Sequence, residues 1–322
     1  MKKGILTRIV IAEILNKLKN SDKKFDELLD SYVIKFSFIE SDIKMIQNIT
    51  LTTIRNFNII IQILDKFIPK INKKNITYYL IMSAICQIHV LKLKEYAVIN
   101  STCEACKEKK GDVGFVNAVL RNITRNKKII ENIDYNKLFF PQWFKKNIKS
   151  LSTKKRKAVY KSILEKPSIH IQLKNHNLIS SLNIEYTRTS KTSICLKKES
   201  NISKINGFKE GYWWIQDIAS AGPIKLLGNI KEKKVIDLCC APGSKTFQLI
   251  NGGAKVTSYD ISLKRINRMK ENLSRLKYEH HINHLDILKI KTSTKYEIVL
   301  LDAPCSATGT LKRNPEIIFR NN

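Results

Sequence analysis

Acidic residues are scarce in this sequence of 322 residues. It has 28 Asp and Glu against 58 Lys and Arg, so its formal net charge at pH 7 is +30. A charge of this sign favours a polyanionic partner, with nucleic acid first and an anionic membrane second. Of the 58 basic residues 47 are Lys, so part of the excess is compositional, and a solvated Lys-rich surface is the alternative interpretation.

Long uninterrupted apolar runs are also missing. Arg8 and Glu13 break the amino-terminal run where a signal peptide needs it unbroken. The stretch 76–93 is nearly uncharged, but polar residues such as Gln87 make it a poor membrane span. We therefore expect a buried helix over 76–93 and no membrane partner.

Cysteine usage argues against a disulfide framework. The seven cysteines are odd in number and include the neighbours Cys239 and Cys240, which suits a reducing compartment such as the cytoplasm. Cys103 and Cys106 form C-x-x-C without a second pair, and the six His residues show no ligand spacing. We expect no metal site.

The amino-terminal half has the periodicity of helices. From about Ile5 to Arg125 apolar residues recur at three and four positions, which predicts a helical bundle. Helix starts are expected at Ser41 and Asp42 and at 100–102, and "KKGDVG" breaks the chain before a helix over 115–123.

The texture changes after this half. The basic stretch "KKNIKSLSTKKRKAVYKSILEKP" predicts one or two more helices, and its charge is also consistent with a solvated face. Beyond Pro167, short alternating runs predict a small mixed module of helices and strands. Trp213 and Trp214 could stack on bases, but adjacent tryptophans favour an anchor at a domain junction.

Strands and helices alternate beyond Lys231. "KKVIDLCCAPGSKTFQLI" predicts a strand ending at Asp237, a loop and a helix, and "AKVTSYDIS" a strand ending at Asp260. Two more strands lead to Asp286 and Asp302. This order is typical of a doubly wound parallel sheet, in which strand carboxyl ends share one edge. We expect the four acids to converge there.

The loop after the first of these strands lacks both common phosphate motifs. "CCAPGSKT" contains neither G-x-G-x-x-G nor a P-loop. S-adenosylmethionine fits better, because it has a ribose and an adenine but no phosphate. Asp260 would bind the ribose, Asp286 the adenine amine, and the backbone near Gly243 the methionine end. For each acid alone, a helix cap or a solvated strand end is the alternative.

Two of these segments resemble a known family. "DLCCAPGSKT" and "LDAPCSATGTLKRNPE" are similar to the cofactor loop and the fourth motif of the RsmB/Nop2 (Sun) family of RNA cytosine-carbon-5 methyltransferases. "FKEGYWWIQDIASAGPIKLL" resembles the segment upstream of the catalytic domain, and "AVINSTCEACKEKKGDVGFVNAVLRNI" resembles the NusB RNA-binding fold. The resemblance covers nearly the whole chain.

The resemblance implies a multidomain fold. An all-α NusB-like bundle would occupy 1–130, linker helices and a small α+β RNA-binding module 131–230, and a truncated α/β Rossmann-like class I methyltransferase domain 231–322. S-adenosylmethionine would be the cofactor, and a cytosine of 16S ribosomal RNA the substrate. We expect a cytoplasmic monomer.

The resemblance also implies which residues bind the cofactor. They are Cys239, Cys240, Ala241, Pro242, Gly243, Ser244, Lys245, Asp260, Asp286 and Asp302. Cys240 and Ser244 stand where the family usually has Ala and Gly, and Ala307 stands where Gly is commoner. All three residues are small, so we expect the loops to keep their shape.

The chemistry requires a thiol. Carbon 5 of cytosine is too weak a nucleophile to take a methyl group directly, so a thiolate first adds at carbon 6. Cys305 is a candidate catalytic thiol, and Asp302 would hold the ring nitrogen. In the family, however, the attacking thiol comes from a later Thr-Cys motif, and the cysteine matching Cys305 assists product release. No Thr-Cys pair follows Asp302, so we expect a truncated domain whose main nucleophile lies beyond Asn322.

Truncation would leave the apolar run 298–301 as an exposed sheet edge. It also keeps a second function open, a noncatalytic RNA-binding protein with a vestigial methyltransferase domain. A DNA cytosine methyltransferase is disfavoured, because those enzymes place the nucleophile in Pro-Cys-Gln and here Ser306 follows Cys305.

The assignment of the ribose acid makes a prediction. Asp260→Ala should weaken binding of S-adenosylmethionine more than Asp237→Ala, because only Asp260 is assigned to the ribose hydroxyls. Titration of the labelled cofactor against both variants measures this, and the reverse order would refute the assignment.

Overall fold

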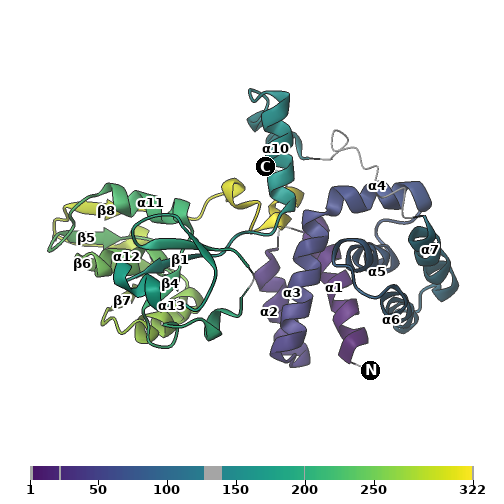
Figure 1. The fold of residues 1–322 in the computed structure, drawn as a ribbon, viewed down its shortest axis with the longest axis horizontal. Helices are drawn as coiled ribbons and strands as arrows, with labels where there is room; N and C mark the ends of the chain where they lie inside the picture. Colours follow the sequence, from purple (N-terminus) through teal and green to yellow (C-terminus); the bar gives the residue numbers. More distant parts are fainter. Residues whose placement is uncertain (1–2, 22, 127–139, 199, 321–322) are drawn as a thin grey trace. The chain divides into compact units, whose positions relative to one another are not determined.

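The computed structural model describes residues 3–21, 23–126, 140–198 and 200–320 (Figure 1). These residues form two compact units. The first comprises the chain up to Pro167 together with the segment from Ala307, and the second comprises 168–306. The predicted domain boundary at 130 lies outside the described residues. The boundary at 230 stays a prediction, since both sides of it lie in the second unit.

The first unit is helical, as the apolar periodicity predicts. Its amino-terminal helices are α1 (Lys3–Asn20), α2 (Phe25–Phe36), α3 (Glu40–Arg55), α4 (Phe57–Phe67), α5 (Ile76–Ile85), α6 (Glu95–Glu108) and α7 (Val113–Arg125). Helix α1 packs against α3, α5 and α6. Ile9, Ala12 and Leu15, spaced at three along the helix, are buried in this core.

The apolar stretch 76–93 forms a buried helix, as predicted. Asn75 caps α5 by accepting a hydrogen bond from the Thr77 amide at 3.0 Å. Every residue of α5 after Ile76 is buried, and the helix continues into a π-helical turn, η1 (Cys86–Val90). No helix among the described residues is both long and apolar enough to cross a membrane.

The predicted helix start at 100–102 is wrong. Helix α6 begins at Glu95, and these residues lie in its interior. The Thr102 hydroxyl donates to the Val98 carbonyl at 2.7 Å and the Ser101 hydroxyl to the Ala97 carbonyl at 2.8 Å. The hydroxyls that suggested a cap therefore bond back along the same helix. Helix α3 begins at Glu40, one residue before the predicted start.

The basic connector contains two short helices, α9 (Gln142–Asn147) and α10 (Thr153–Leu164), as predicted. The segment from Ala307 packs in the same unit and contains the 3-10 turns η6 (Thr308–Thr310) and η7 (Pro315–Phe319). Ile317 is buried there. The Phe319 ring meets that of Phe57 at 4.7 Å between centroids. The Trp143 indole donates to the Arg320 carbonyl at 3.2 Å.

The second unit begins with an antiparallel sheet. Its strands are β1 (His170–Leu173), β2 (Tyr186–Arg188), β3 (Ser193–Leu196) and β4 (Trp213–Ile215), in the order β2-β3-β1-β4. The 3-10 turns η3 (His176–Ser181) and η4 (Ile202–Lys204) lie in its connections, and α11 (Ile218–Leu226) follows it. This is the small module of helices and strands that the sequence predicts.

A parallel sheet completes the second unit (Figure 1). Its strands are β5 (Lys234–Asp237), β6 (Lys255–Asp260), β7 (Ile282–His284) and β8 (Ile298–Leu300), in the order β7-β6-β5-β8. Between them lie α12 (Ser244–Asn251), α13 (Leu263–Arg275) and the turn η5 (Ile287–Lys289). The Rossmann-like prediction is confirmed, and β8 is an edge strand with Val299 63% exposed.

The chain order of these strands creates a switch point. From β5 the chain moves outward to β6 and β7, and β8 then pairs with the other side of β5. In doubly wound sheets ligands bind at such a point, outside the carboxyl ends of the strands. The ends of β5 and β8 are therefore the first place to look for a site.

The two adjacent tryptophans join the antiparallel module to the parallel sheet. Successive side chains of a strand point to opposite faces. Trp213 accordingly packs in the core of the small module, and Trp214 packs with Phe247 and Met269 beside α12 and α13. Both are almost fully buried, so the junction interpretation is confirmed and base stacking by these rings is excluded.

The same junction requires glycine at position 211. Gly211 has φ +74°, and an added Cβ would lie 2.1 Å from the Arg275 carbonyl oxygen. Arg275 in turn donates to the carbonyls of Phe208 at 2.8 Å and Trp213 at 3.0 Å. A side chain at 211 would therefore push the module away from the end of α13.

We predict that Gly211→Ala lowers the free energy of unfolding by about 2 kcal/mol or more, through strain and the clash with Arg275. Chemical denaturation followed by tryptophan fluorescence measures this. The control is Gly222→Ala in α11, where a Cβ meets nothing within 4 Å. Equal stability of the two variants would show that the junction is not tightly fitted.

Candidate functional site

The loop between β5 and α12 is held from below by Asp237. This carboxylate is 1% exposed at the end of β5, and its Oδ2 accepts a 2.7 Å hydrogen bond from the Thr246 hydroxyl in α12. Burial raises the pKa of Asp237 to about 6, although the Thr246 bond opposes the shift. The bond ties the end of the strand to the first turn of the helix and so fixes both ends of the loop.

Asp260 at the end of β6 holds the middle of the same loop. Its carboxylate, 2% exposed, accepts from the Ala241 amide at 3.0 Å and from the Ser262 amide at 2.9 Å. The Arg265 guanidinium lies 3.7 Å from it. The Cys240 amide also donates to the Tyr259 carbonyl at 3.0 Å. The loop is therefore fastened to β6 by backbone groups that any sequence would have.

Gly243 lets the loop enter α12 at close range. It has φ +107°, a region that favours glycine, and an added Cβ would lie 2.4 Å from the Phe247 ring. The Phe247 amide donates to the Gly243 carbonyl at 2.8 Å. A side chain at 243 would displace either the ring or the loop.

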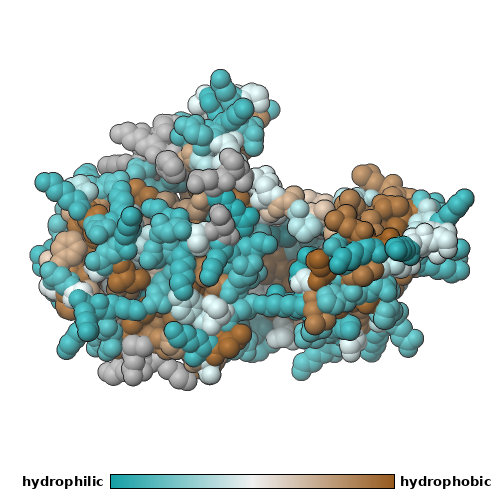
Figure 2. Space-filling model, turned by 180° about the vertical axis from the view of Figure 1, so that it is seen from behind, coloured by the Kyte–Doolittle hydropathy of each residue, from teal (hydrophilic) through white to brown (hydrophobic). Residues whose placement is uncertain are grey.

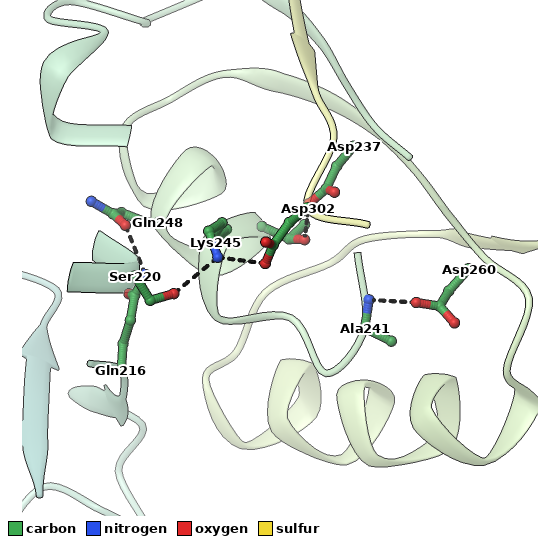
Figure 3. A network of polar contacts seen from close by, with 9 residues as sticks. Gln216, Ser220, Asp237, Ala241, Lys245, Gln248, Asp260 and Asp302 are labelled. Carbon is green, nitrogen blue, oxygen red and sulfur yellow. Dashed lines mark hydrogen bonds and ion pairs between the residues drawn. The ribbon is translucent and has the colours of Figure 1, made fainter. Parts of the chain in front are cut away.

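An ion pair crosses the switch point (Figure 3). The Lys245 ammonium donates to the Asp302 carboxylate at 2.6 Å and to the Ser220 hydroxyl at 3.0 Å. Lys245 lies in α12, Asp302 follows β8 and Ser220 lies in α11. The Lys245 side chain is 14% exposed and that of Asp302 is 60% exposed, so the carboxylate keeps a surface that a ligand can reach.

A second polar link lies beside this ion pair (Figure 3). The Gln216 amide donates to the Gln248 oxygen at 2.9 Å and accepts from the Trp214 indole at 2.8 Å. Sequence reasoning noted Gln216 only as part of a family segment, and it missed Ser220 and Gln248. Their only signal is that polar residues lie on helices beside the cofactor loop, which no local pattern distinguishes from a solvated face.

The four predicted acids follow the carboxyl ends of the four parallel strands, as expected. Asp237, Asp260 and Asp302 are linked through the loop. Asp286 instead accepts from the Leu288 amide at 3.0 Å and caps η5. That contact is the helix-cap alternative, so a role in binding adenine stays a prediction for Asp286.

The cysteines near the site differ in accessibility. Burial raises the pKa of Cys240 to about 12, with smaller contributions from Asp237 and Asp260. Burial also raises the pKa of Cys239, helped by the same two carboxylates. Both thiols therefore stay protonated at neutral pH. Cys305 is exposed, and it is the accessible thiol of the segment that follows β8.

The parallel sheet, its switch point and this loop define a methyltransferase-like α/β domain. Residues 224–322 match the model of the family described as 16S rRNA methyltransferase RsmB/F, and residues 6–125 match that of the NusB family. The chain therefore combines a NusB-family domain with a methyltransferase domain of the RsmB/F family, which confirms the resemblance seen in the motifs.

Named relatives agree with these domains. The chain is 29% identical over 272 residues to the ribosomal RNA small subunit methyltransferase B of Shewanella oneidensis, covering 77% of this chain and 62% of that protein. It is 24% identical to the protein of the same name from Cronobacter sakazakii, covering 98% and 79%. The chain thus spans about two thirds to four fifths of its relatives' lengths.

A solved structure shares the fold. The crystal structure of PH0851 matches with a TM-score of 0.67 and 17% identity, covering 100% of this chain and 79% of that one. At this identity the likeness supports the architecture alone.

The raised pKa of Asp237 predicts a pH-dependent stability. Its folded-state pKa of about 6 lies above its ordinary value of 3.8. Ionisation in the folded state therefore costs free energy, and this cost develops as the pH rises from about 4 to about 6.5. Relative to Asp237→Asn, the wild type should lose roughly 3 kcal/mol at most over that range and no more above it.

Urea denaturation of both proteins between pH 4 and 8 measures this difference. Asn can still accept the Thr246 hydrogen bond, so the substitution removes the charge and keeps the contact. Parallel stability curves across this range would contradict the burial of an ionisable Asp237.

Proposed function

We propose that this chain is an S-adenosylmethionine-dependent methyltransferase that acts on carbon 5 of a cytosine in small-subunit ribosomal RNA. The observation that carries the proposal is the loop 238–245, which Asp237 and Asp260 fasten at the switch point of a sheet that matches the RsmB/F family. The names of the relatives and the NusB-family domain support ribosomal RNA as the substrate.

The residues at this edge suit such a cofactor. S-adenosylmethionine offers ribose hydroxyls, an adenine amine and an ammonium group, and it carries a positive sulfonium. Acid side chains at strand ends are the acceptors that these donors need, and a phosphate-free ligand makes no use of a glycine-rich phosphate loop. We assign the loop 239–245 with Asp260, Asp286 and Asp302 to its binding.

The bound cofactor supplies an electrophilic methyl group, and the chain's own residues supply the rest. A thiolate adds to carbon 6 of cytosine, and the displaced electron pair makes carbon 5 nucleophilic. Asp302, which Lys245 orients at 2.6 Å, would hold the ring nitrogen. After methylation a base removes the proton on carbon 5, and the carbon–sulfur bond breaks. We propose Cys305 as a thiol of this cycle that assists product release.

The target base must leave its stack to reach the thiol and the methyl group. RNA that is single-stranded or distorted meets this requirement with the least cost. The basic character of the chain supports binding of the surrounding phosphates.

The cofactor assignment predicts a specific loss of binding. Gly243→Ala should weaken binding of S-adenosylmethionine at least tenfold in calorimetry, because a Cβ cannot fit beside Phe247 without moving the loop. Gly222→Ala is the control and should bind as the wild type does. If the wild type binds no S-adenosylmethionine, the catalytic proposal fails, and a noncatalytic RNA-binding function is favoured.

The target atom is tested with 16S ribosomal RNA that carries tritium on carbon 5 of cytosine. Methylation there releases tritium to water, whereas methylation elsewhere on the base retains it. Labelled methyl groups that enter the RNA without tritium release would refute the carbon 5 assignment and leave the methyltransferase assignment intact.

A further inference from the structure

Helices α9 and α10 and the turn between them carry basic residues and no acid. The sequence from Gln142 to Leu164 contains no Asp or Glu. Its basic residues are Lys145, Lys146, Lys149, Lys154, Lys155, Arg156, Lys157 and Lys161. Such a density of one charge sign is expensive unless a counter-charge is nearby.

Four of these lysines lie on the exposed side of α10. Lys154, Lys157 and Lys161 are spaced at three and four, so they share one face of the helix, and Lys155 lies beside them. All four are exposed, whereas Ile163 on the opposite side is buried. We call these four residues the α10 lysine face. In Figure 2 the surface of α10, at the top of the view, is coloured hydrophilic.

The α10 lysine face is held on a folded support. The ring of Tyr160 on α10 stacks on that of Phe140 at 4.5 Å, and Phe140 stacks on Phe144 of α9 at 4.9 Å. Ser152 caps α10 by accepting from the Lys155 amide at 3.4 Å. The lysines are therefore presented in a fixed arrangement, about 10 Å long at 1.5 Å of rise per residue.

These lysines differ from others on the surface in their pairing. Within the described parts of the chain no carboxylate forms an ion pair with any of the four. Four other exposed lysines have such partners. They are Lys44 with Glu40 at 2.5 Å, Lys73 with Asp65 at 3.4 Å, Lys198 with Glu185 at 2.6 Å and Lys255 with Glu232 at 2.8 Å.

We propose that the α10 lysine face binds the phosphate backbone of RNA. This inference rests on the proposed function and names the surface that would hold the substrate. A length of about 10 Å spans roughly six charges of a nucleic acid duplex, so four lysines in this span have enough phosphates to contact. Lysine ammonium groups bind phosphates as point charges without reading the bases.

The composition of α10 favours RNA over an anionic membrane. A helix that lies in a membrane surface needs large apolar side chains free to enter the lipid. The larger apolar residues of α10 are instead committed to the protein, since Tyr160 stacks on Phe140 and Ile163 is buried. Between the lysines the exposed residues are the small Ala158 and Ser162.

The position of this surface fits a role in holding substrate. A groove of about 450 Å³ runs between α10 and the segment 308–312, lined on one side by Ala158 and Ser162 and on the other by Thr308 and Gly309. That segment begins three residues after Cys305 in the sequence. RNA held on α10 would therefore lie beside the chain that leads directly from the proposed catalytic residues.

The test is the salt dependence of RNA binding. The variant with Lys154, Lys155, Lys157 and Lys161 all changed to Gln keeps good helix formers on α10. The control variant changes Lys44, Lys73, Lys198 and Lys255 to Gln and removes the same charge from paired positions. Filter binding with a 16S ribosomal RNA transcript, at salt from about 50 to 200 mM, gives the slope of log K against log salt.

We expect the slope of the α10 variant to fall in magnitude by about 2 to 3, at roughly 0.7 for each lost phosphate contact, and that of the control to change much less. Equal slopes for the two variants would overturn the inference while leaving RNA binding intact. No RNA binding by the wild type would overturn both. Binding to phosphatidylglycerol vesicles that only the α10 variant loses, with RNA binding unchanged, would assign the surface to a membrane.

Discussion

The burial of two carboxylates under one loop is the constraint on which the candidate site depends. Asp237 and Asp260 are almost fully enclosed, and their oxygens hold one hydroxyl and two backbone amides. Because a buried acceptor left without partners costs free energy, the loop has little freedom to leave them. The loop thus has a fixed shape before any ligand arrives, and the exposed Asp302 beside it is free to contact that ligand.

The small antiparallel module belongs to the same construction. Trp214 reaches from β4 to the residues packed around the loop, and its indole fixes Gln216, which in turn fixes Gln248 of α12. Trp213 anchors the opposite face of the strand in the module. The module therefore buttresses the helix that follows the cofactor loop, and the two sheets share one rigid junction.

Local patterns in the sequence predicted what local patterns determine. The alternation after Lys231 predicted strands ending at Asp237 and Asp260, and the motifs predicted the family. The pairing of Lys245 with Asp302 joins residues 57 positions apart, and nothing near either one signals the other. The start of α6 was mispredicted, because Ser101 and Thr102 satisfy their hydroxyls within a helix as readily as at its end. The roles of the individual site residues stay predictions.

The grouping of the segment from Ala307 with the helices gives the molecule a closed covalent path. The backbone passes from the first unit to the second after Pro167 and returns after Ser306. A protease cut at the first passage would leave the units joined through residues 307–320, which stay embedded among the helices. A cut at the second would leave them joined through the first passage. The peptide that carries Cys305 is thus tethered at both ends, and a single nick does not release either body.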